Sequence, residues 1–325
     1  MNIWVDANGW PFPPIILLGC FVAEILYFRG WRLLVKEAPA TASAGVKTPP
    51  LLPGFDVAAY QQDGLGWRWR GTFFLGAILT LLVASSAPID NLSGRLFWVH
   101  MVQHLLLLVI MAPLLVLGSP LISWWLGLPA WARRFVQSCA RLKAGRILAR
   151  IGRWLLHPVI SCLLLIAGIW VWHWPGLYDL ALTNDLIHDW CEHSIFIIVS
   201  VLFWCQVIPT SPLRLRLGYI GRMCCVGVAI AQNFVLAVLL GFAPVPLYAP
   251  YAQLAHALGG LTALQDQQLG AGIMWTFGDV PFGIAVAILV QQWLASQSDD
   301  TQITAPVQVK PAIEGTHAGG AGPDA

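Results

Sequence analysis

The segment NDLIHDWCEHSIFIIVSVLFWCQVI, residues 184–208, decides how this chain folds. Its last 15 residues carry no charge, whereas its first ten hold two Asp, one Glu, two His and one Cys. A helix needs about 20 mainly apolar residues to cross the hydrocarbon of a membrane. The segment therefore predicts a membrane-spanning helix that carries a group of ionisable side chains at its beginning.

The composition of the whole chain supports the same class of protein. Of its 325 residues, 58% are hydrophobic and 10% are charged, and the mean hydropathy is +0.70. Soluble domains carry about 25% charged residues, so this chain cannot cover a surface that faces water. A net charge of +2 indicates no nucleic-acid partner. The seven Cys lack CxxC spacing, and the first ten residues lack the basic region of a cleaved signal peptide.

Seven segments are apolar and long enough to predict an all-α bundle of seven transmembrane helices. They cover residues 12–30, 70–88, 96–118, 157–175, 188–208, 220–242 and 268–294. We expect one transmembrane domain over residues 1–295. It includes a flexible cytoplasmic loop at 37–66 and a basic interfacial cytoplasmic segment at 129–156. A polar tail at 296–325 is predicted to be cytoplasmic and disordered.

The basic residues predict the orientation of the bundle. Cytoplasmic loops of membrane proteins carry an excess of Lys and Arg. If seven spans alternate, all of the 18 Lys and Arg residues except Arg95 fall on one side. The N-terminus is therefore predicted to lie outside and the C-terminus in the cytoplasm. In the 129–156 segment, Arg residues alternate with apolar ones at nearly helical spacing, which is typical of a helix on an anionic membrane surface.

Most of the histidines are predicted to gather at the outer face. His100 and His104 are four residues apart, so both rings project from one side of a helix, about 6 Å apart along its axis. That spacing allows two imidazoles to bind a single ion. Met101 lies next to this pair and could add a thioether ligand. His256 also falls at this face.

The predicted span at 188–208 and the residues just before it are predicted to carry two neighbouring polar stripes. One contains Asp185, His188 and Glu192, and the other contains Asp189 and His193. A carboxylate one turn from an imidazole can fix its tautomer and raise its basicity. Ionisable groups at membrane depth cost about 2.5–3.5 kcal/mol each, so they are functional by default.

Other candidates come with ordinary alternatives. His173 can be an interfacial hydrogen-bonding residue, and acids such as Asp185 can simply favour a helix N-terminus. Met274 can be a packing residue, although it shares a stripe with Asp266 and Gly270. The full set of candidate metal ligands is His100, His104, His188, Glu192, His193, His173, Asp266, Met101 and Met274.

Four blocks of sequence resemble the multi-span CtaG family, the bacterial assembly factors for caa3-type cytochrome c oxidase. They are HMVQHLLLLVIMAPLLVLGSP (100–120), HWPGLYDLAL (173–182), LIHDWCEHSIFIIVSVLFWCQVI (186–208) and DQQLGAGIMW (266–275). The resemblance covers residues 67–295. It implies a multi-pass protein of the bacterial inner membrane that is not an enzyme and helps copper to reach a haem–copper oxidase. Its implied partners are oxidase subunits, a periplasmic copper donor and membrane lipids.

The residues themselves leave the metal and the activity open. Imidazole suits Zn, Cu, Fe and Ni, and sulfur ligands shift the preference toward Cu(I). One alternative is a b-type haem oxidoreductase with His104 and His193 as axial ligands. Another is a proton-coupled transporter in which Glu24, Asn233 and Asp279 form the relay. The sequence HDWCEH does not match the HExxH motif of metalloproteases, so an intramembrane metalloenzyme ranks last.

Overall fold

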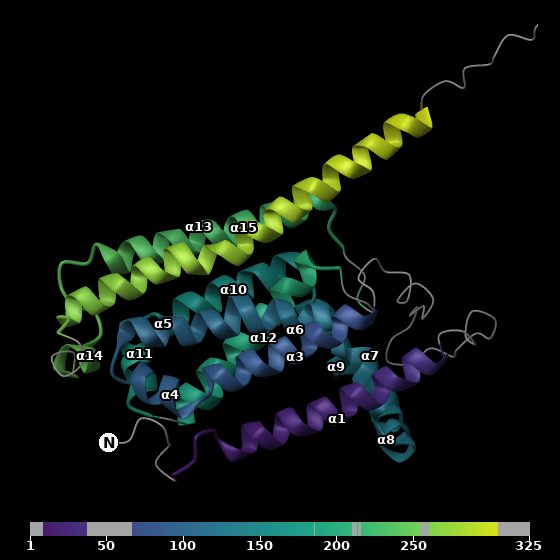
Figure 1. Ribbon diagram of the computed structural model, residues 1–325, viewed down its shortest axis with the longest axis horizontal. Coiled ribbons are helices and arrows are strands. Elements are labelled where there is room, and N and C mark those ends of the chain that lie inside the picture. The colour runs from purple at the N-terminus through teal and green to yellow at the C-terminus, as the bar shows by residue number, and fades with distance from the viewer. Residues whose placement is uncertain are drawn as a thin grey trace, which may run out of the picture.

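The fold was analysed in a computed structural model that describes residues 9–37, 67–184, 186–209, 213, 216–254 and 260–304. All of the elements in this part of the chain are helices (Figure 1). In chain order they are α1 (Pro14–Glu37), α3 (Trp67–Ala84), α4 (Ala87–Ser93), α5 (Phe97–Leu105), η1 (Leu106–Met111), α6 (Ala112–Gly118), α7 (Pro120–Gly127), α8 (Ala130–Arg141), α9 (Lys143–Leu155), α10 (Pro158–Trp172), α11 (Pro175–Leu182), η2 (Leu186–Glu192), α12 (His193–Val207), α13 (Tyr219–Gly241), α14 (Ala249–Leu254) and α15 (Ala263–Thr304). Two of them, η1 and η2, are π-helices.

The prediction of an all-helical membrane protein is confirmed. Among the described residues, five continuous helical stretches are long and apolar enough to cross a membrane. Two bent pairs raise the number to seven if each pair forms one span: α3 with α4, bent by 50°, and α9 with α10, bent by 80°. The structure therefore gives between five and seven candidate spans.

Four predicted connecting segments contain helices. Helices α4, α11 and α14 occupy predicted loops, and the basic segment at 129–156 forms α8 and α9. Neither α8 nor α9 has a buried side chain, and their apolar residues Trp131, Phe135 and Leu148 are exposed. An amphipathic helix pair is therefore present, and its position on the membrane surface stays a prediction.

The two segments predicted to lack structure fall largely outside the described residues. For the loop, only Glu37, the last residue of α1, is described. For the tail, α15 continues to Thr304, so the first nine residues of the predicted disordered segment, 296–304, are helical. No Pro or Gly interrupts residues 296–304, so the sequence holds no strong helix breaker there.

Two pairs of helices approach closely because glycines lie at their contacts. A Cβ on Gly30 of α1 would overlap the Ser123 carbonyl of α7, and one on Gly127 would overlap the Leu26 carbonyl of α1. A Cβ on Gly270 of α15 would overlap the Phe97 ring of α5. Small residues let membrane helices pack backbone against backbone. These contacts fix α1 against α7 and α5 against α15.

The π-helix η1 joins α5 to α12 through a backbone carbonyl. The Leu108 oxygen accepts hydrogen bonds from the Ser200 hydroxyl and, at 3.1 Å, from the Trp204 indole nitrogen. A π-helical turn loosens the usual i to i−4 bonding, which leaves carbonyls available to side chains. These two hydrogen bonds therefore fix α12 beside η1.

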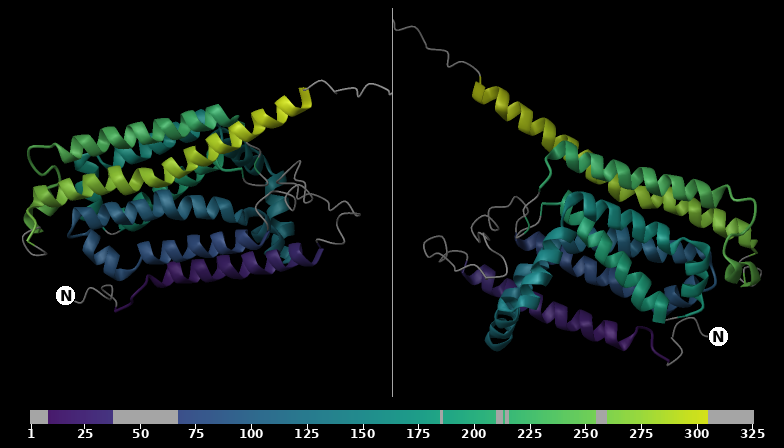
Figure 2. Two further views of the ribbon diagram at one scale, coloured as in Figure 1. Left: turned by 45° about the horizontal axis from the view of Figure 1, so that its top comes forward. Right: turned by 180° about the vertical axis from the view of Figure 1, so that it is seen from behind.

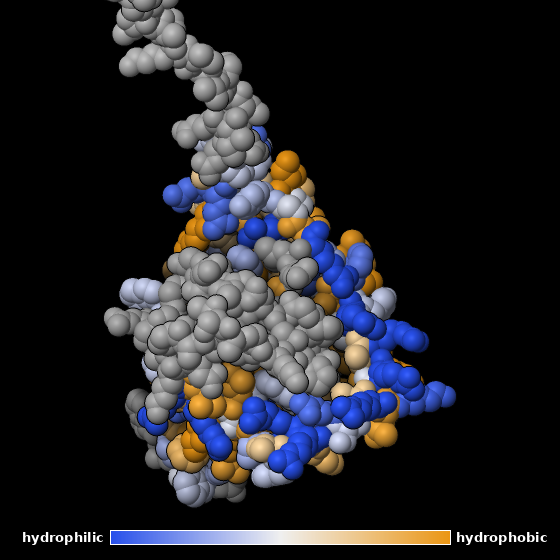
Figure 3. Space-filling view, turned by 90° about the vertical axis from the view of Figure 1, so that its right-hand side faces the viewer, coloured by the Kyte–Doolittle hydropathy of each residue, from blue (hydrophilic) through white to orange (hydrophobic). Residues whose placement is uncertain are grey.

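The two ends of the bundle differ in character. Helices α4, α11 and α14 gather at one end, and α8 and α9 lie toward the other (Figure 1). Helices α13 and α15 run side by side in all three ribbon views (Figures 1 and 2). Figure 3 looks at the α8–α9 end and shows hydrophilic and hydrophobic side chains interleaved on its surface. Helix α5 runs from the first end toward the second, so its histidines lie near α4, α11 and α14.

Candidate metal centre

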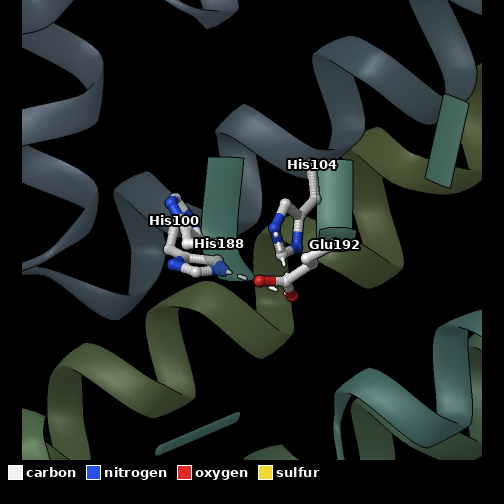
Figure 4. A group of neighbouring side chains, drawn as sticks. All are labelled: His100, His104, His188 and Glu192. Atoms are coloured by element: carbon white, nitrogen blue, oxygen red, sulfur yellow. Dashed lines mark ion pairs between the residues drawn. The ribbon is translucent and has the colours of Figure 1, made fainter. Parts of the chain in front are cut away.

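Three imidazoles and one carboxylate meet where α5 packs beside η2. His100 and His104 come from α5, and His188 and Glu192 come from η2; we call these four residues the His/Glu cluster. Each offers one ligand atom, and the four atoms lie within 4.8 Å of one another. Figure 4 shows the four side chains turned toward a common point. The sequence-based expectation that these residues converge is met in the geometry.

The nitrogen and oxygen atoms of the cluster lie close together, although no hydrogen bond joins them. Glu192 Oε1 lies 3.6 Å from His104 Nε2 and 4.0 Å from His100 Nε2. The rings of His100 and His104 are 4.1 Å apart between centroids and nearly perpendicular. Two donors on one ion lie about 3–4 Å apart, because metal–nitrogen and metal–oxygen bonds are about 2.0–2.2 Å. The cluster is therefore within a small side-chain adjustment of a metal-binding geometry.

The π-helical geometry of η2 adds His193 to the same side. In an α-helix each residue turns the chain by about 100°, so positions 188 and 193 would point about 140° apart. In a π-helix the hydrogen bonds join residues five apart, so His188 and His193 stack one turn from each other. Their ring centroids lie 4.4 Å apart, and His193 is 5.7 Å from His104. His188 of the first predicted stripe and His193 of the second thus lie in one group.

Tyr251 fixes the tautomer of His100. Its hydroxyl lies 2.6 Å from the Ser93 carbonyl oxygen and 3.1 Å from His100 Nδ1. A carbonyl can only accept, so the hydroxyl proton goes to Ser93 and His100 Nδ1–H donates to the tyrosine oxygen. Burial raises the pKa of Tyr251 well above its usual value, which keeps that proton in place. His100 Nε2 is left with a lone pair that faces the cluster.

Asp189 fixes the tautomer of His188 in a similar way. Its Oδ1 lies 3.0 Å from His188 Nδ1, so the carboxylate holds the proton on that nitrogen. His188 Nε2 then carries the lone pair. A carboxylate or other oxygen behind a metal-binding imidazole is the usual way in which proteins orient such a ligand.

The cluster and two histidines near it hold most of the unsatisfied polar atoms in the described part of the chain. Eleven buried side-chain nitrogens and oxygens have no hydrogen-bond partner there. Seven of them are ring nitrogens or a carboxylate oxygen near this site: His100 Nε2, His104 Nδ1 and Nε2, His173 Nε2, His188 Nε2, His193 Nε2 and Glu192 Oε2. Buried polar groups are normally satisfied, so such a concentration calls for a bound group.

A cavity of about 300 Å³ adjoins the site, and its mostly apolar lining includes a few polar side chains. It lies between α1, α3 and the start of α12, and Asp90, Asp189 and His193 line it. The group His188, Asp189 and His193 forms a second set of donor atoms within 4.8 Å of one another. His188 therefore belongs to both sets, and the second set faces the cavity.

Three of the predicted ligands make other contacts. Asp266 is fully buried, and its two oxygens accept hydrogen bonds from the backbone N–H groups of Phe97 and Trp98, at 2.8 and 3.1 Å. It therefore caps the beginning of α5 and supports the cluster from behind. Met101 packs against Gly270, and the Met274 carbonyl accepts a bond from Asn233; both methionine side chains lie in the main apolar core.

The remaining predicted residues have mixed outcomes. His173 is buried beyond the end of α10, with Nδ1 2.8 Å from the Ile169 carbonyl and its ring 6.2 Å from that of Tyr178. It is not one of the residues in either donor set. Asp185 and His256 lie outside the described residues.

The sequence-based reasoning did not identify Tyr251 or Asp90. Tyr251 lies in the short helix α14, where no periodic pattern marks it. Asp90 lies in α4 and accepts a hydrogen bond of 3.2 Å from Gln103 Nε2, which also donates to the Ala84 carbonyl. An acid six residues before the predicted span at 96–118 was the available signal for Asp90.

Comparison with known proteins places this site in a family. An uncharacterized protein of Mycobacterium bovis is 24% identical over 237 residues, which are 73% of this chain and 36% of the relative. One of Mycobacterium leprae is 22% identical over 270 residues, 83% of this chain and 40% of the relative. The chain thus spans about two fifths or less of the length of these relatives, and no solved structure matches it. The family model of the cytochrome c oxidase caa3 assembly factor matches residues 56–296. The chain belongs to this family of cytochrome c oxidase assembly factors.

Proposed function

We propose that this protein assists assembly of a caa3-type haem–copper oxidase by binding copper in the His/Glu cluster and handing it on. The observation that carries the proposal is the concentration of buried, unpartnered imidazole nitrogens and a carboxylate at one point. Family membership supports the oxidase as the partner. Copper is the cargo in this scheme, and the protein is not an enzyme.

The donor set favours a divalent ion. Three imidazole nitrogens and one carboxylate oxygen are borderline to hard ligands, whereas thioether and thiolate would favour Cu(I). Cys191, beside Glu192, is exposed, and Met101 packs in the apolar core. Sites of nitrogen and oxygen bind Cu²⁺ more tightly than the other divalent first-row metals. We therefore propose Cu²⁺ as the form that is held.

The second donor set supports a route into the cluster. An ion that enters the cavity would first meet Asp90, Asp189 and His193, and it could pass to the cluster by way of His188. The acids there attract cations, and the open side of the cavity is where a donor protein could approach. We propose a seven-span topology in which this end faces the periplasm and the α8–α9 end faces the cytoplasm.

The geometry gives less support to the two alternatives. The rings of His104 and His193 touch edge to face, with centroids 5.7 Å apart, which leaves no slot for a porphyrin between them. Asn233 Nδ2 donates to Asp279 Oδ1 at 2.9 Å and to the Met274 carbonyl at 3.0 Å. These bonds join α13 to α15, which favours a structural role over a proton relay.

Metal analysis of the purified protein tests the proposal. We expect the wild type to bind one Cu²⁺ per chain, with nitrogen splitting in the electron paramagnetic resonance spectrum. The variants His104→Ala and Glu192→Gln should each bind copper at least tenfold more weakly. His157→Ala is the matched control, because this histidine lies at the other end of the bundle, before α10.

Cellular activity provides the second part of the test. Oxidase activity in membranes of a deletion strain should be restored by the wild type and by His157→Ala, but not by His104→Ala. Equal copper binding by the wild type and His104→Ala would remove the cluster as the copper site. Full restoration by His104→Ala would mean that assembly does not depend on it.

A further inference from the structure

A second cavity lies at the opposite end of the bundle from the His/Glu cluster. Its volume is about 440 Å³, and it lies between the C-terminal parts of α6, α12 and α15 and the beginning of α13. Most of its lining is apolar and includes Leu114, Trp204 and Leu289. None of the described residues that line it is acidic. The cavity therefore suits a hydrocarbon chain and repels no anion.

A buried arginine gives this cavity a positive charge. Arg222 is 6% exposed and lines the cavity. Its Nε donates to the Val207 carbonyl at 2.8 Å, and its guanidinium carbon lies 5.5 Å from the centre of the Tyr219 ring. Within the part of the chain that the structure describes, no carboxylate forms an ion pair with Arg222. A buried charge without a counter-ion is costly, so an anion from outside the chain is expected to balance it.

A second cation lines the same cavity. Arg70, 2% exposed, comes from the first turn of α3, and its Nη1 donates to the Ser119 hydroxyl. The phosphate of a ligand on Arg222 would therefore lie in a positive field with contributions from two separate helices. Guanidinium groups bind phosphate oxygens through paired hydrogen bonds, which makes arginine well suited to this task.

The side of the cavity is open to the surroundings of the bundle. Ile110, Ile284 and Ile288 line it and are 37%, 56% and 48% exposed. In a membrane these isoleucines face the hydrocarbon, so a ligand can enter sideways from the lipid. The arginines lie at the end of the bundle that carries α8 and α9, whose Arg and Lys residues match an anionic membrane surface.

We propose that this cavity binds an anionic phospholipid, with an acyl chain against the apolar wall and the phosphate on Arg222. A phospholipid fits both features, since its chain requires an apolar space at membrane depth and its headgroup requires a cation at the end of that space. The site is separate from the His/Glu cluster, and the inference does not depend on copper. The lipid would fill the space between α12 and α15 and hold them at their present separation.

Lipid retention by the full-length protein tests this inference. The protein would be purified from bacterial membranes in a mild detergent, and bound phosphatidylglycerol would be measured by native mass spectrometry during titration. Arg222→Gln should weaken phosphatidylglycerol binding about tenfold and leave the weak binding of phosphatidylcholine unchanged. Arg222→Lys should keep at least half of the retained lipid. Arg216→Gln, which removes an exposed charge at the same end, is the matched control and should behave as the wild type.

A second variant tests the apolar half of the site without changing charge. Ala285 lines the cavity, and Ala285→Phe should fill it and lower lipid retention about tenfold. Size-exclusion profiles and circular dichroism spectra like those of the wild type would show that both variants are folded, and neither measurement depends on the copper proposal. Wild-type retention of phosphatidylglycerol by Arg222→Gln, or by Ala285→Phe, would overturn the inference. Equal affinity of the wild type for phosphatidylcholine would also overturn it.

Discussion

His100 and His188 are each held from behind by an oxygen atom, Tyr251 Oη in one case and Asp189 Oδ1 in the other. Both bonds involve Nδ1, so both Nε2 atoms are free to bind an ion. The arrangement pre-orients two rings that would otherwise rotate, and it selects the tautomer that a metal requires. The donor atoms and their supports therefore form one unit, although they come from three separate stretches of the chain.

Removal of the Tyr251 hydroxyl tests this support. We expect Tyr251→Phe to lower copper affinity about 10- to 100-fold, because the His100 ring loses its orienting partner. Tyr248→Phe is the control: Tyr248 stacks in the same aromatic group, but its hydroxyl donates to the His173 carbonyl. Titration with Cu²⁺ and a competing chelator measures the copper affinity of each variant. Equal affinity for the two variants would show that Tyr251 does not act through His100.

Asp266 offers a test that separates support from ligation. Asp266→Asn keeps an oxygen that can accept one of the two backbone bonds at the start of α5, whereas Asp266→Ala keeps none. We expect Asp266→Ala to lower stability by about 1–2 kcal/mol, the usual cost of a lost helix cap. Asp266→Asn should keep near-normal copper affinity, measured by the same titration. A complete loss of copper in Asp266→Asn would restore Asp266 as a ligand.

At the scale of helices, the site depends on how closely α15 approaches α5. Gly270 touches the Phe97 ring, which is stacked on Tyr248 with 5.2 Å between centroids and so has little room to move. Phe97 begins the helix that carries His100 and His104. A larger residue at position 270 would therefore displace α5, and with it His100 and His104, relative to η2.

We expect Gly270→Ala to lower the free energy of unfolding by about 1–3 kcal/mol through overpacking and to weaken copper binding. Gly272→Ala is the matched control, since a Cβ there has no atom within 4 Å. Thermal unfolding in detergent followed by circular dichroism measures the difference. A Gly270→Ala protein as stable as Gly272→Ala would mean that the two helices are not held as tightly as the contact indicates.

Much of this helical architecture was predictable, because apolar stretches of span length have few alternatives in a membrane. The pairing of His100 with His104 was predictable for a similar reason: four residues make about one α-helical turn. The approach of His193 to His188 was not, since it depends on a π-helix that no residue pattern announces. Tyr251 was missed because its position beside His100 is a tertiary contact. Asp266 was predicted as a ligand from its stripe with Gly270 and Met274 and from the family resemblance, but its oxygens accept hydrogen bonds from the backbone of α5.

At the scale of the whole molecule, charge asymmetry predicts which end faces the cytoplasm. Helices α8 and α9 carry seven Lys and Arg residues and no acid, and they lie at the end away from α4, α11 and α14. The donor groups of the His/Glu cluster and the acids of its side cavity lie at the other end. Such a polarised molecule can receive a cation on one side and hold anionic lipid on the other.

Reporter fusions test the orientation. Alkaline phosphatase is active only outside the cytoplasm, and green fluorescent protein exported in unfolded form does not fluoresce. We expect a fusion after Ala325 to give fluorescence and no phosphatase activity. A fusion truncated after Gly94, next to α4, should give the opposite result. Phosphatase activity at Ala325 would reverse the topology and would put the His/Glu cluster on the cytoplasmic side.

The π-helical turn at η2 makes the count of residues in that stretch part of the chemistry. Loss of one residue between His188 and His193 would let the stretch return to ordinary α-helical winding, and the two histidines would then be four residues apart, about 40° from each other around the axis. Ordinary winding without a deletion would instead turn His188 about 140° away from His193 while every donor remained in the chain. Among related sequences, a one-residue gap in this short stretch would therefore be a weaker sign of lost metal binding than the replacement of a histidine.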